Sequence, residues 1–271
     1  MKNLKKAAAG AFALSASLLL AACGGGSSDD DATAASSAAS SSAAESLGTI
    51  NVFAAASLVD VLPEIDQQLK DEHPGTEVTY NFDGSSGLVD QLAGGAKADL
   101  LLTANAKTMT SAEDQDLVEA SQSFTSNTLV MVVPAGNPGK VTGLDDGSLD
   151  GKKLVVCAEE VPCGSATAQL EEVNNIELSP VSEEQSVTDV LGKVTSGEAD
   201  AGLVYTTDAK GAGDAVEVIE VPGADDIVND YRIAVVKDAA NADGAKSFMD
   251  LILSDDGQKV LTDFGFGAPL S

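Results

Sequence analysis

The sequence is poor in histidine and in basic side chains. Its 271 residues include one His, three Cys and 15 Lys plus Arg, against 43 Asp plus Glu, so the formal net charge is −28 at pH 7. Because so acidic a surface repels a phosphate backbone, the composition argues against nucleic-acid binding. One histidine, His73, and three cysteines are also too few for the common histidine-based metal centres and serine triads. These shortages favour a protein that binds a ligand over an enzyme.

The N-terminus has the pattern of a secretory signal. Three lysines within Met1–Lys6 precede Ala7–Ala22, an uncharged stretch that is too short for a typical transmembrane helix. It ends in Leu20-Ala21-Ala22-Cys23, which resembles the lipobox of bacterial lipoproteins. The resemblance implies that residues 1–22 are removed and that Cys23 is lipidated. An ordinary signal peptide with an incidental cysteine is the alternative.

Residues 24–47 consist mainly of Gly, Ser, Ala and a few acidic residues. They lack the periodic large apolar side chains that offset the entropy of ordering, so we expect residues 23–47 to form a lipidated, disordered tether. A flexible segment of this length spans about 27 Å on average. We therefore expect a globular body held by its lipid anchor alone at the extracytoplasmic face of the cell membrane.

The other two cysteines, Cys157 and Cys163, lie six positions apart. Outside the cytoplasm such a pair usually oxidises, so we expect a disulfide that stiffens the loop 158–162. Free buried thiols are the alternative, and a zinc site would need two more ligands.

Short apolar runs alternate with amphipathic stretches from Thr49 onward, which indicates an α/β fold. The expected strands are 49–54, 76–82, 99–103, 127–133, 153–158, 200–205, 216–221 and 231–236. The expected helices are 58–69, with Pro63 removing a hydrogen bond within it, then 86–93, 106–120, 165–173, 186–196, a short one at Asp208, 243–253 and 256–264.

The distribution of these elements predicts two lobes. About 80 residues of the body precede the strand at Asn127 and about 40 follow Tyr231. The simplest assembly has a first lobe of residues 48–126 and 232–271 and a second lobe of residues 127–231. Two extended crossings would join them, with a ligand cleft in between.

Four transitions from strand to helix carry small or hydroxyl residues. They are FAAASL (53–58), DGSSG (83–87), VPCG (161–164) and EQSV (184–187). Each offers backbone N–H groups that lack an acceptor in the helix, and small side chains let a ligand come close. The residues alone leave a second interpretation open, in which the serines are helix caps and the glycines turn residues.

From Thr49 to the C-terminus the sequence resembles the molybdate-binding proteins of bacterial ABC importers, which are type II periplasmic substrate-binding proteins. The matching segments are FAAASL, GSSGL (84–88), ADLLLTAN (98–105), VPCG and GLVYTTDA (202–209). The resemblance implies a two-lobed α/β fold with a hinge of two crossing strands. It also implies a monomer that captures molybdate or tungstate for an ABC permease, with no enzymatic activity and no cofactor.

In that family a tetrahedral oxyanion is held by two serines, two backbone amides and a tyrosine hydroxyl. The corresponding groups are the hydroxyls of Ser57, Ser85 and Tyr205 and the amides of Cys163 and Val187. No side chain bonds to the metal atom directly. Ser86 is the alternative to Ser85 if the loop shifts by one residue. On the residues alone, an ordinary core tyrosine is the preferred interpretation of Tyr205, and more strongly so of Tyr80 and Tyr231.

Simple electrostatics agrees with this ligand set. Four helix N-termini at about +0.5 each oppose the −2 charge of molybdate without any cation. A lining of donors disfavours protonated phosphate, whose O–H would lack an acceptor. Sulfate is fully ionised, so it must be rejected by the size of the cavity. The sequence does not distinguish tungstate from molybdate. Three other functions stay open: the same fold with sulfate or another small oxyanion, a serine hydrolase using Ser57 or Ser85, and a surface lipoprotein without a small ligand.

Overall fold

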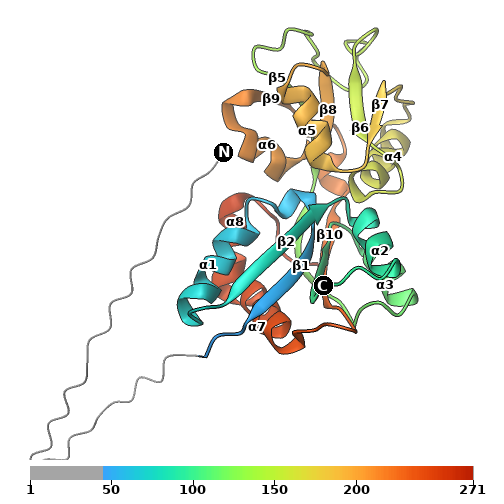
Figure 1. Cartoon of the computed structure of the whole chain (residues 1–271). Coiled ribbons are helices and arrows are strands. Elements are labelled where there is room, and N and C mark those ends of the chain that lie inside the picture. The colour runs from blue at the N-terminus through green and yellow to red at the C-terminus, as the bar shows by residue number, and fades with distance from the viewer. Residues whose placement is uncertain (1–44, 271) are drawn as a thin grey trace, which may run out of the picture. The chain divides into compact units, whose positions relative to one another are not determined.

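Ten strands in the described part of the chain form two separate five-stranded sheets (Figure 1). The computed structural model describes residues 45–270, so the predicted signal, Cys23 and most of the predicted tether lie outside the described residues. One sheet has the strand order β2-β1-β3-β10-β4 and the other β7-β6-β8-β5-β9. We call the part built on the first sheet lobe 1 and the part built on the second lobe 2.

The sheet of lobe 1 has parallel and antiparallel strands. They are β1 (Thr49–Ala55), β2 (Glu77–Asp83), β3 (Leu100–Thr103), β4 (Gln122–Asn127) and β10 (Asn229–Val235). The strand β1 pairs in parallel with β2 and β3, whereas β10 runs antiparallel to both β3 and β4. The carboxyl ends of β1, β2 and β3 therefore lie at one edge of the sheet, from which the chain enters the helices of the predicted site.

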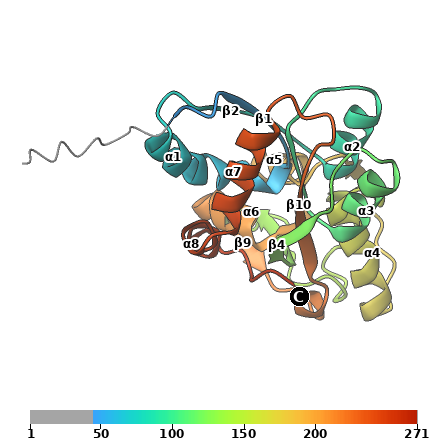
Figure 2. The same cartoon turned by 90° about the horizontal axis from the view of Figure 1, so that it is seen from below.

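Helices cover both faces of this sheet (Figures 1 and 2). They are the short 3-10 helix η1 (Ala56–Leu58), α1 (Leu62–Glu72), α2 (Ser85–Ala93), α3 (Ala106–Asp114), α7 (Ala242–Leu253) and α8 (Asp255–Phe264). The helices α1 and α7 lie on one face and α2 and α3 on the other. The apolar stripe predicted for α1 packs into the core, where Leu62, Ile65 and Leu69 are buried.

Lobe 2 repeats the same architecture. Its strands are β5 (Leu129–Pro134), β6 (Leu154–Cys157), β7 (Ser182–Glu184), β8 (Ala201–Tyr205) and β9 (Val216–Ile219). The strand β6 pairs in parallel with β7 and β8, and β5 is antiparallel to β8 and β9. The helices are α4 (Pro162–Asn174), α5 (Val187–Thr195), α6 (Thr206–Ala212), and the short η2 (Gly213–Ala215) and η3 (Ala224–Asp226).

The chain crosses between the lobes twice, and the two crossings lie side by side. It leaves lobe 1 at the end of β4 through Thr128 and returns from η3 into β10. Asn127 on the outward path is the register partner of Asn229 on the return path. The predicted two-lobed α/β fold with a hinge of two strands is therefore confirmed. The exact residue limits predicted for the lobes stay a prediction.

Four local features differ from the sequence expectations. Pro63 lies in the first turn of α1, where its missing N–H has no intrahelical partner to lose, so the expected loss of a hydrogen bond does not arise. The helix predicted for residues 106–120 ends at Asp114, because Asp116 has a left-handed φ of 60°. The strands β4 and β7 were not predicted.

The last residues of the predicted tether make contacts with lobe 1. The backbone N–H of Leu47 donates to Thr76 Oγ1 at 3.0 Å, and the Leu47 carbonyl accepts from Asn241 Nδ2 at 2.7 Å. Among residues 45–270, no helix is long and apolar enough to cross a membrane.

Candidate functional site

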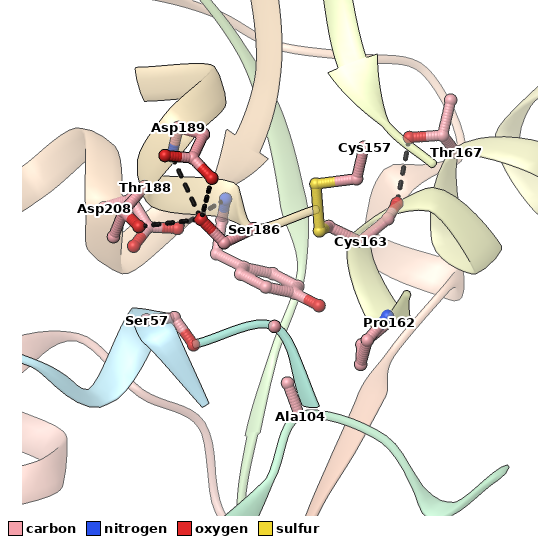
Figure 3. Close-up of a disulfide and its surroundings, with 12 residues drawn as sticks. Ser57, Ala104, Cys157, Pro162, Cys163, Thr167, Ser186, Thr188, Asp189 and Asp208 are labelled. Carbon is pink, nitrogen blue, oxygen red and sulfur yellow. Dashed lines mark hydrogen bonds between the residues drawn. A yellow bond between two sulfur atoms is a disulfide. The ribbon is translucent and has the colours of Figure 1, made fainter. Parts of the chain in front are cut away.

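A small cavity lies between the two lobes and contains all five predicted ligand residues. Lobe 1 contributes Ala55, Ala56, Ser57, Asp83, Gly84, Ser85 and Ala104, and lobe 2 contributes Val161, Pro162, Cys163, Ser186, Val187 and Tyr205. The cavity has a volume of about 220 Å³, part of which is open solvent. Figure 3 shows Ser57 and Ala104 opposite Pro162, Cys163 and Ser186. Residues of both lobes thus meet around one small space.

Ser57 is the second residue of η1, directly after β1. The preceding Ala55 and Ala56 line the cavity with side chains of minimal size, so the backbone lies close to the enclosed space. The Ser57 Oγ atom is 2.7 Å from the hydroxyl oxygen of Tyr231, and either atom can be the donor. When Tyr231 donates, the hydroxyl hydrogen of Ser57 is free for a ligand.

Ser85 is the first residue of α2 and is 1 % exposed. Its Oγ atom accepts the backbone N–H of Ala104 at 3.0 Å, so its own hydrogen is free for a ligand. Its neighbour Ser86 has a different contact, because its hydroxyl donates to the carbonyl oxygen of Glu160 in lobe 2 at 2.6 Å. Ser85 lines the cavity and Ser86 does not.

The Cys163 amide lies in the first turn of α4, where backbone N–H groups have no acceptor within the helix. The predicted disulfide is present and joins Cys163 to Cys157 at the end of β6, with Cα atoms 5.6 Å apart (Figure 3). The next residue must be glycine, because a Cβ atom at Gly164 would lie 1.8 Å from the carbonyl oxygen of Ala158. The disulfide and this close approach together fix the start of α4 against the loop that precedes it.

Val187 is the first residue of α5, so its amide is also free of an intrahelical acceptor. The preceding Ser186 caps the helix, with Oγ accepting the N–H of Asp189 at 3.2 Å and donating to Asp189 Oδ2 at 2.7 Å. Ser186 is therefore a helix cap, which is the second interpretation that the sequence left open. Val187, which follows it, also lines the cavity.

Tyr205 ends β8 and is fully buried. Its hydroxyl oxygen accepts from Asn229 Nδ2 at 3.0 Å, and the same nitrogen donates to the carbonyl oxygen of Ala104 at 2.9 Å. Burial raises the pKa of Tyr205 well above its usual value, and repulsion from the negative charges of ionised Tyr231 and Asp208 raises it further. The phenol therefore keeps its proton and serves as a hydrogen-bond donor.

The ionisable groups around the cavity are acidic, and local N–H groups donate hydrogen bonds to them. Asp83 lines the cavity, but its two oxygens accept from the Gly84 N–H at 2.8 Å and from Gln91 Nε2 at 3.1 Å. Asp208 follows Tyr205 and accepts the Tyr205 N–H at 3.0 Å. Burial, with a smaller contribution from the charge of Asp60, raises the pKa of Asp208 to about 7.

Neither a metal centre nor a serine triad is formed by the described residues. None of the residues that line the cavity is basic, and no group of three His, Cys, Asp or Glu side chains in residues 45–270 is placed to hold a metal ion. His73 caps the far end of α1, and its Nδ1 atom is 2.9 Å from the carbonyl oxygen of Glu45. It is not hydrogen-bonded to Ser57 or Ser85, whose partners are given above.

Three residues around the site were not predicted to take part in it. Tyr231 contacts Ser57, Asn229 contacts Tyr205, and Ala104 contacts both Ser85 and Asn229. The sequence marks Tyr231 and Ala104 only as buried residues of strand ends. The contacts of Tyr231 with Ser57 and of Ala104 with Asn229 join segments more than a hundred positions apart, whereas those of Asn229 with Tyr205 and of Ala104 with Ser85 span 24 and 19 positions.

Comparisons with known proteins identify the family. Residues 50–267 match the family described as bacterial extracellular solute-binding protein. The chain belongs to this family. It is 42 % identical to the molybdate-binding protein ModA of Mycobacterium tuberculosis H37Rv, over 82 % of this chain and 85 % of that protein. It is also 31 % identical to the putative ABC transporter substrate-binding lipoprotein YvgL of Bacillus subtilis, over 83 % and 88 %.

A solved structure shows the same fold. The substrate-binding domain of a putative molybdenum ABC transporter from Clostridium difficile superposes with a TM-score of 0.60 at 28 % identity, covering 82 % of this chain and 99 % of that chain. The predicted type II periplasmic-binding-protein fold is thus confirmed. The family membership also confirms that the chain is a substrate-binding protein and not an enzyme.

Proposed function

We propose that this solute-binding protein captures molybdate or tungstate outside the cytoplasm and delivers it to an ABC permease. The observation that carries the proposal is a cavity between the lobes that brings hydroxyl and backbone N–H donors of both lobes together and has no basic residue in its lining, in which Asp83 is the one acidic residue and is hydrogen-bonded to Gly84 and Gln91. The name of the Mycobacterium tuberculosis relative, at 42 % identity, supports the same ligand class.

The proposed ligands are all neutral donors. The hydroxyls of Ser57 and Ser85 come from lobe 1, and the hydroxyl of Tyr205 and the amides of Cys163 and Val187 come from lobe 2. Each of them lies at or next to the start of a helix: η1, α2, α6, α4 and α5 respectively. The dipoles of these helices favour negative charge at this point, so a dianion is stabilised without a counter-cation.

The hydrogen-bonding state of each hydroxyl agrees with this role. Ser85 and Tyr205 both have their oxygen atoms occupied as acceptors, by Ala104 N–H and Asn229 Nδ2. Their hydrogens are therefore available to a ligand that accepts and does not donate. A fully ionised tetrahedral oxyanion has this property, whereas the O–H of protonated phosphate would face donors and lose its hydrogen bond.

The size of the anion decides between the remaining candidates. Sulfate carries the same charge as molybdate, so the cavity must exclude it by fit, with donors spaced for the longer metal–oxygen bonds. Molybdate and tungstate have nearly the same size, and we propose that both bind. The anion is cargo, and the protein needs no cofactor to hold it.

We also propose that the protein is a monomer anchored through a lipidated Cys23 after removal of residues 1–22. The lipobox-like sequence supports this, as does the lipoprotein designation of the relative in Bacillus subtilis. The tether would let the two lobes, 127–231 and 48–126 with 232–271, face the permease while the lipid stays in the membrane.

Calorimetric titration of the purified protein, lacking residues 1–23, with molybdate, tungstate, sulfate and phosphate tests the proposal. We expect saturable binding of the first two with a submicromolar dissociation constant, and none of the last two at the same concentrations. Equal binding of sulfate would assign the cavity to another oxyanion, and no heat with any anion would reject an oxyanion receptor.

A further inference from the structure

One residue of the cavity wall has no side chain and lies directly against the other lobe. Gly84 immediately precedes α2 in lobe 1, and a Cβ atom built on it would be 1.9 Å from the carbonyl oxygen of Gln185 in lobe 2. The carbonyl carbon of Gln185 would be 3.1 Å away, and Val161 Cγ1, also in lobe 2, would be 3.5 Å away. Contacts of a Cβ atom below 3.0 Å essentially do not occur in proteins, so any side chain at this position requires the backbone at Gly84 and the backbone at Gln185 to move apart.

The backbone conformation of Gly84 does not itself require glycine. Its φ and ψ are −58° and 134°, a region that every L-amino acid adopts. The reason for a glycine at position 84 therefore lies in the contact with lobe 2 and not in the turn that begins α2. Alanine fits lobe 1 as well as glycine does, provided that lobe 2 is not pressed against it.

The segments that meet Gly84 also carry the proposed anion donors. Gln185 is two residues before Val187, and Val161 is two residues before Cys163. Next to Gly84, the hydroxyl of Ser86 donates across the same interface to the carbonyl oxygen of Glu160 at 2.6 Å. The approach of lobe 2 to Gly84 therefore sets how close the amides of lobe 2 come to Ser85.

We propose that Gly84 is a positioning residue for ligand capture, because the missing side chain lets the lobes close far enough for both to reach one anion. The proposal rests on the proposed function and adds a residue that is not itself among the ligands. A methyl group at position 84 forces a separation of about 1.5 Å before ordinary contact is restored at 3.4 Å. Hydrogen bonds that are lengthened by this amount are lost.

The test compares Gly84→Ala with Gly87→Ala, a substitution three residues further along in α2. A Cβ atom at Gly87 meets only Asp83 of its own lobe, at an ordinary 3.6 Å. Molybdate affinity is measured by calorimetry, the radius of gyration by X-ray scattering with and without molybdate, and unfolding by thermal melting without ligand. We expect Gly84→Ala to bind at least tenfold more weakly and to stay more extended with molybdate, with unchanged ligand-free melting. We expect Gly87→Ala to match the wild type within about twofold.

Several results would overturn the proposal. Wild-type affinity in Gly84→Ala contradicts it, and so does weaker binding with a wild-type radius of gyration, which would indicate a local effect on Ser85. If Gly84→Ala does not fold, Ser86→Ala removes a closing contact without adding an atom, and unchanged affinity and unchanged dimensions in that variant overturn the proposal. If the wild type itself binds no molybdate, the proposed function fails. The proposed role of Gly84 in bringing the lobes together then holds only if the radius of gyration of ligand-free Gly84→Ala is larger than that of the ligand-free wild type.

Discussion

The hydroxyl oxygen of Tyr205 accepts a hydrogen bond from Asn229 Nδ2 at 3.0 Å. Asn229 lies where the chain returns from lobe 2 to lobe 1, and its amide also donates to the carbonyl oxygen of Ala104 in lobe 1. Asn229 in the hinge thus orients the Tyr205 hydroxyl of lobe 2 and is itself hydrogen-bonded to Ala104 of lobe 1. This relationship ties the position of the hinge to the donor that Tyr205 offers to a ligand.

The first prediction concerns Tyr205. Tyr205→Phe removes one donor from the cavity, so we expect molybdate binding to weaken by about 1.5–3 kcal/mol, the value of a hydrogen bond to a charged acceptor. Tyr80→Phe is the control, because the Tyr80 hydroxyl donates to Asp66 and Leu62 within lobe 1, outside the cavity. Calorimetry of both variants measures the difference. Equal affinity of the two would show that Tyr205 is only a core residue.

The sequence marked the lining of the cavity through features that act locally. A serine or a glycine at the start of a helix has its effect within a few residues, so FAAASL, GSSGL, VPCG and EQSV stand out without knowledge of the fold. The assignment of Ser57, Ser85, Cys163, Val187 and Tyr205 as ligands came from the family resemblance and stays a proposal. The contacts of Ser57 with Tyr231 and of Tyr205 with Asn229 depend on tertiary structure, and no pattern in the residues pointed to them.

The errors in secondary structure have the same origin. The strand β4 has the sequence QSFTSN, in which polar residues occupy positions that are buried by pairing with β10 and by contacts with the C-terminal residues Gly267 and Ala268. The helix α3 ends early at the left-handed Asp116, and beyond it Val118 pairs with Val236, 118 positions away along the chain. In both places the departure from the local pattern coincides with a tertiary contact.

A second prediction concerns Asp208, whose pKa is raised to about 7 by burial. Folded protein holds this proton more tightly than unfolded protein, in which an Asp has a pKa near 3.9. Stability should therefore be fully present below pH 4 and should fall as the pH rises to about 7, relative to a variant without the carboxyl group. Asp208→Asn keeps an acceptor for the Tyr205 N–H and removes this dependence.

Chemical denaturation at pH 5, 6, 7 and 8 measures the effect. We expect Asp208→Asn to gain stability over the wild type as the pH rises, by up to about 4 kcal/mol, because one pKa unit corresponds to about 1.4 kcal/mol. The exposed Asp225→Asn is the matched control and should show no such trend. A difference between wild type and Asp208→Asn that is the same at every pH would contradict the raised pKa.

A third prediction concerns the disulfide between Cys157 and Cys163. It closes a loop of seven residues, and its replacement in Cys157→Ala/Cys163→Ala should lower the free energy of unfolding by about 2 kcal/mol. Because the bond holds the start of α4, molybdate affinity should fall as well, although the amide of residue 163 remains. The wild type treated with reductant should behave like the double variant. Unchanged affinity in both would show that the loop is held without the bond.

A fourth prediction separates the two adjacent serines of α2. Ser85→Ala removes a donor at the cavity, so we expect an affinity loss of about 1.5–3 kcal/mol, whereas Ser86→Ala removes only a contact between the lobes and should cost less. Calorimetry with molybdate on both variants measures the order. The reverse order would place Ser86 on the anion.

The most direct test of the account is a crystal structure of the protein with molybdate, with the metal located by its anomalous scattering. We expect one strong peak in the cavity between the lobes, with its oxygen atoms within 3.2 Å of the hydroxyls of Ser57, Ser85 and Tyr205 and the amides of Cys163 and Val187. A metal peak elsewhere, or an empty cavity in crystals grown with excess molybdate, would contradict the account.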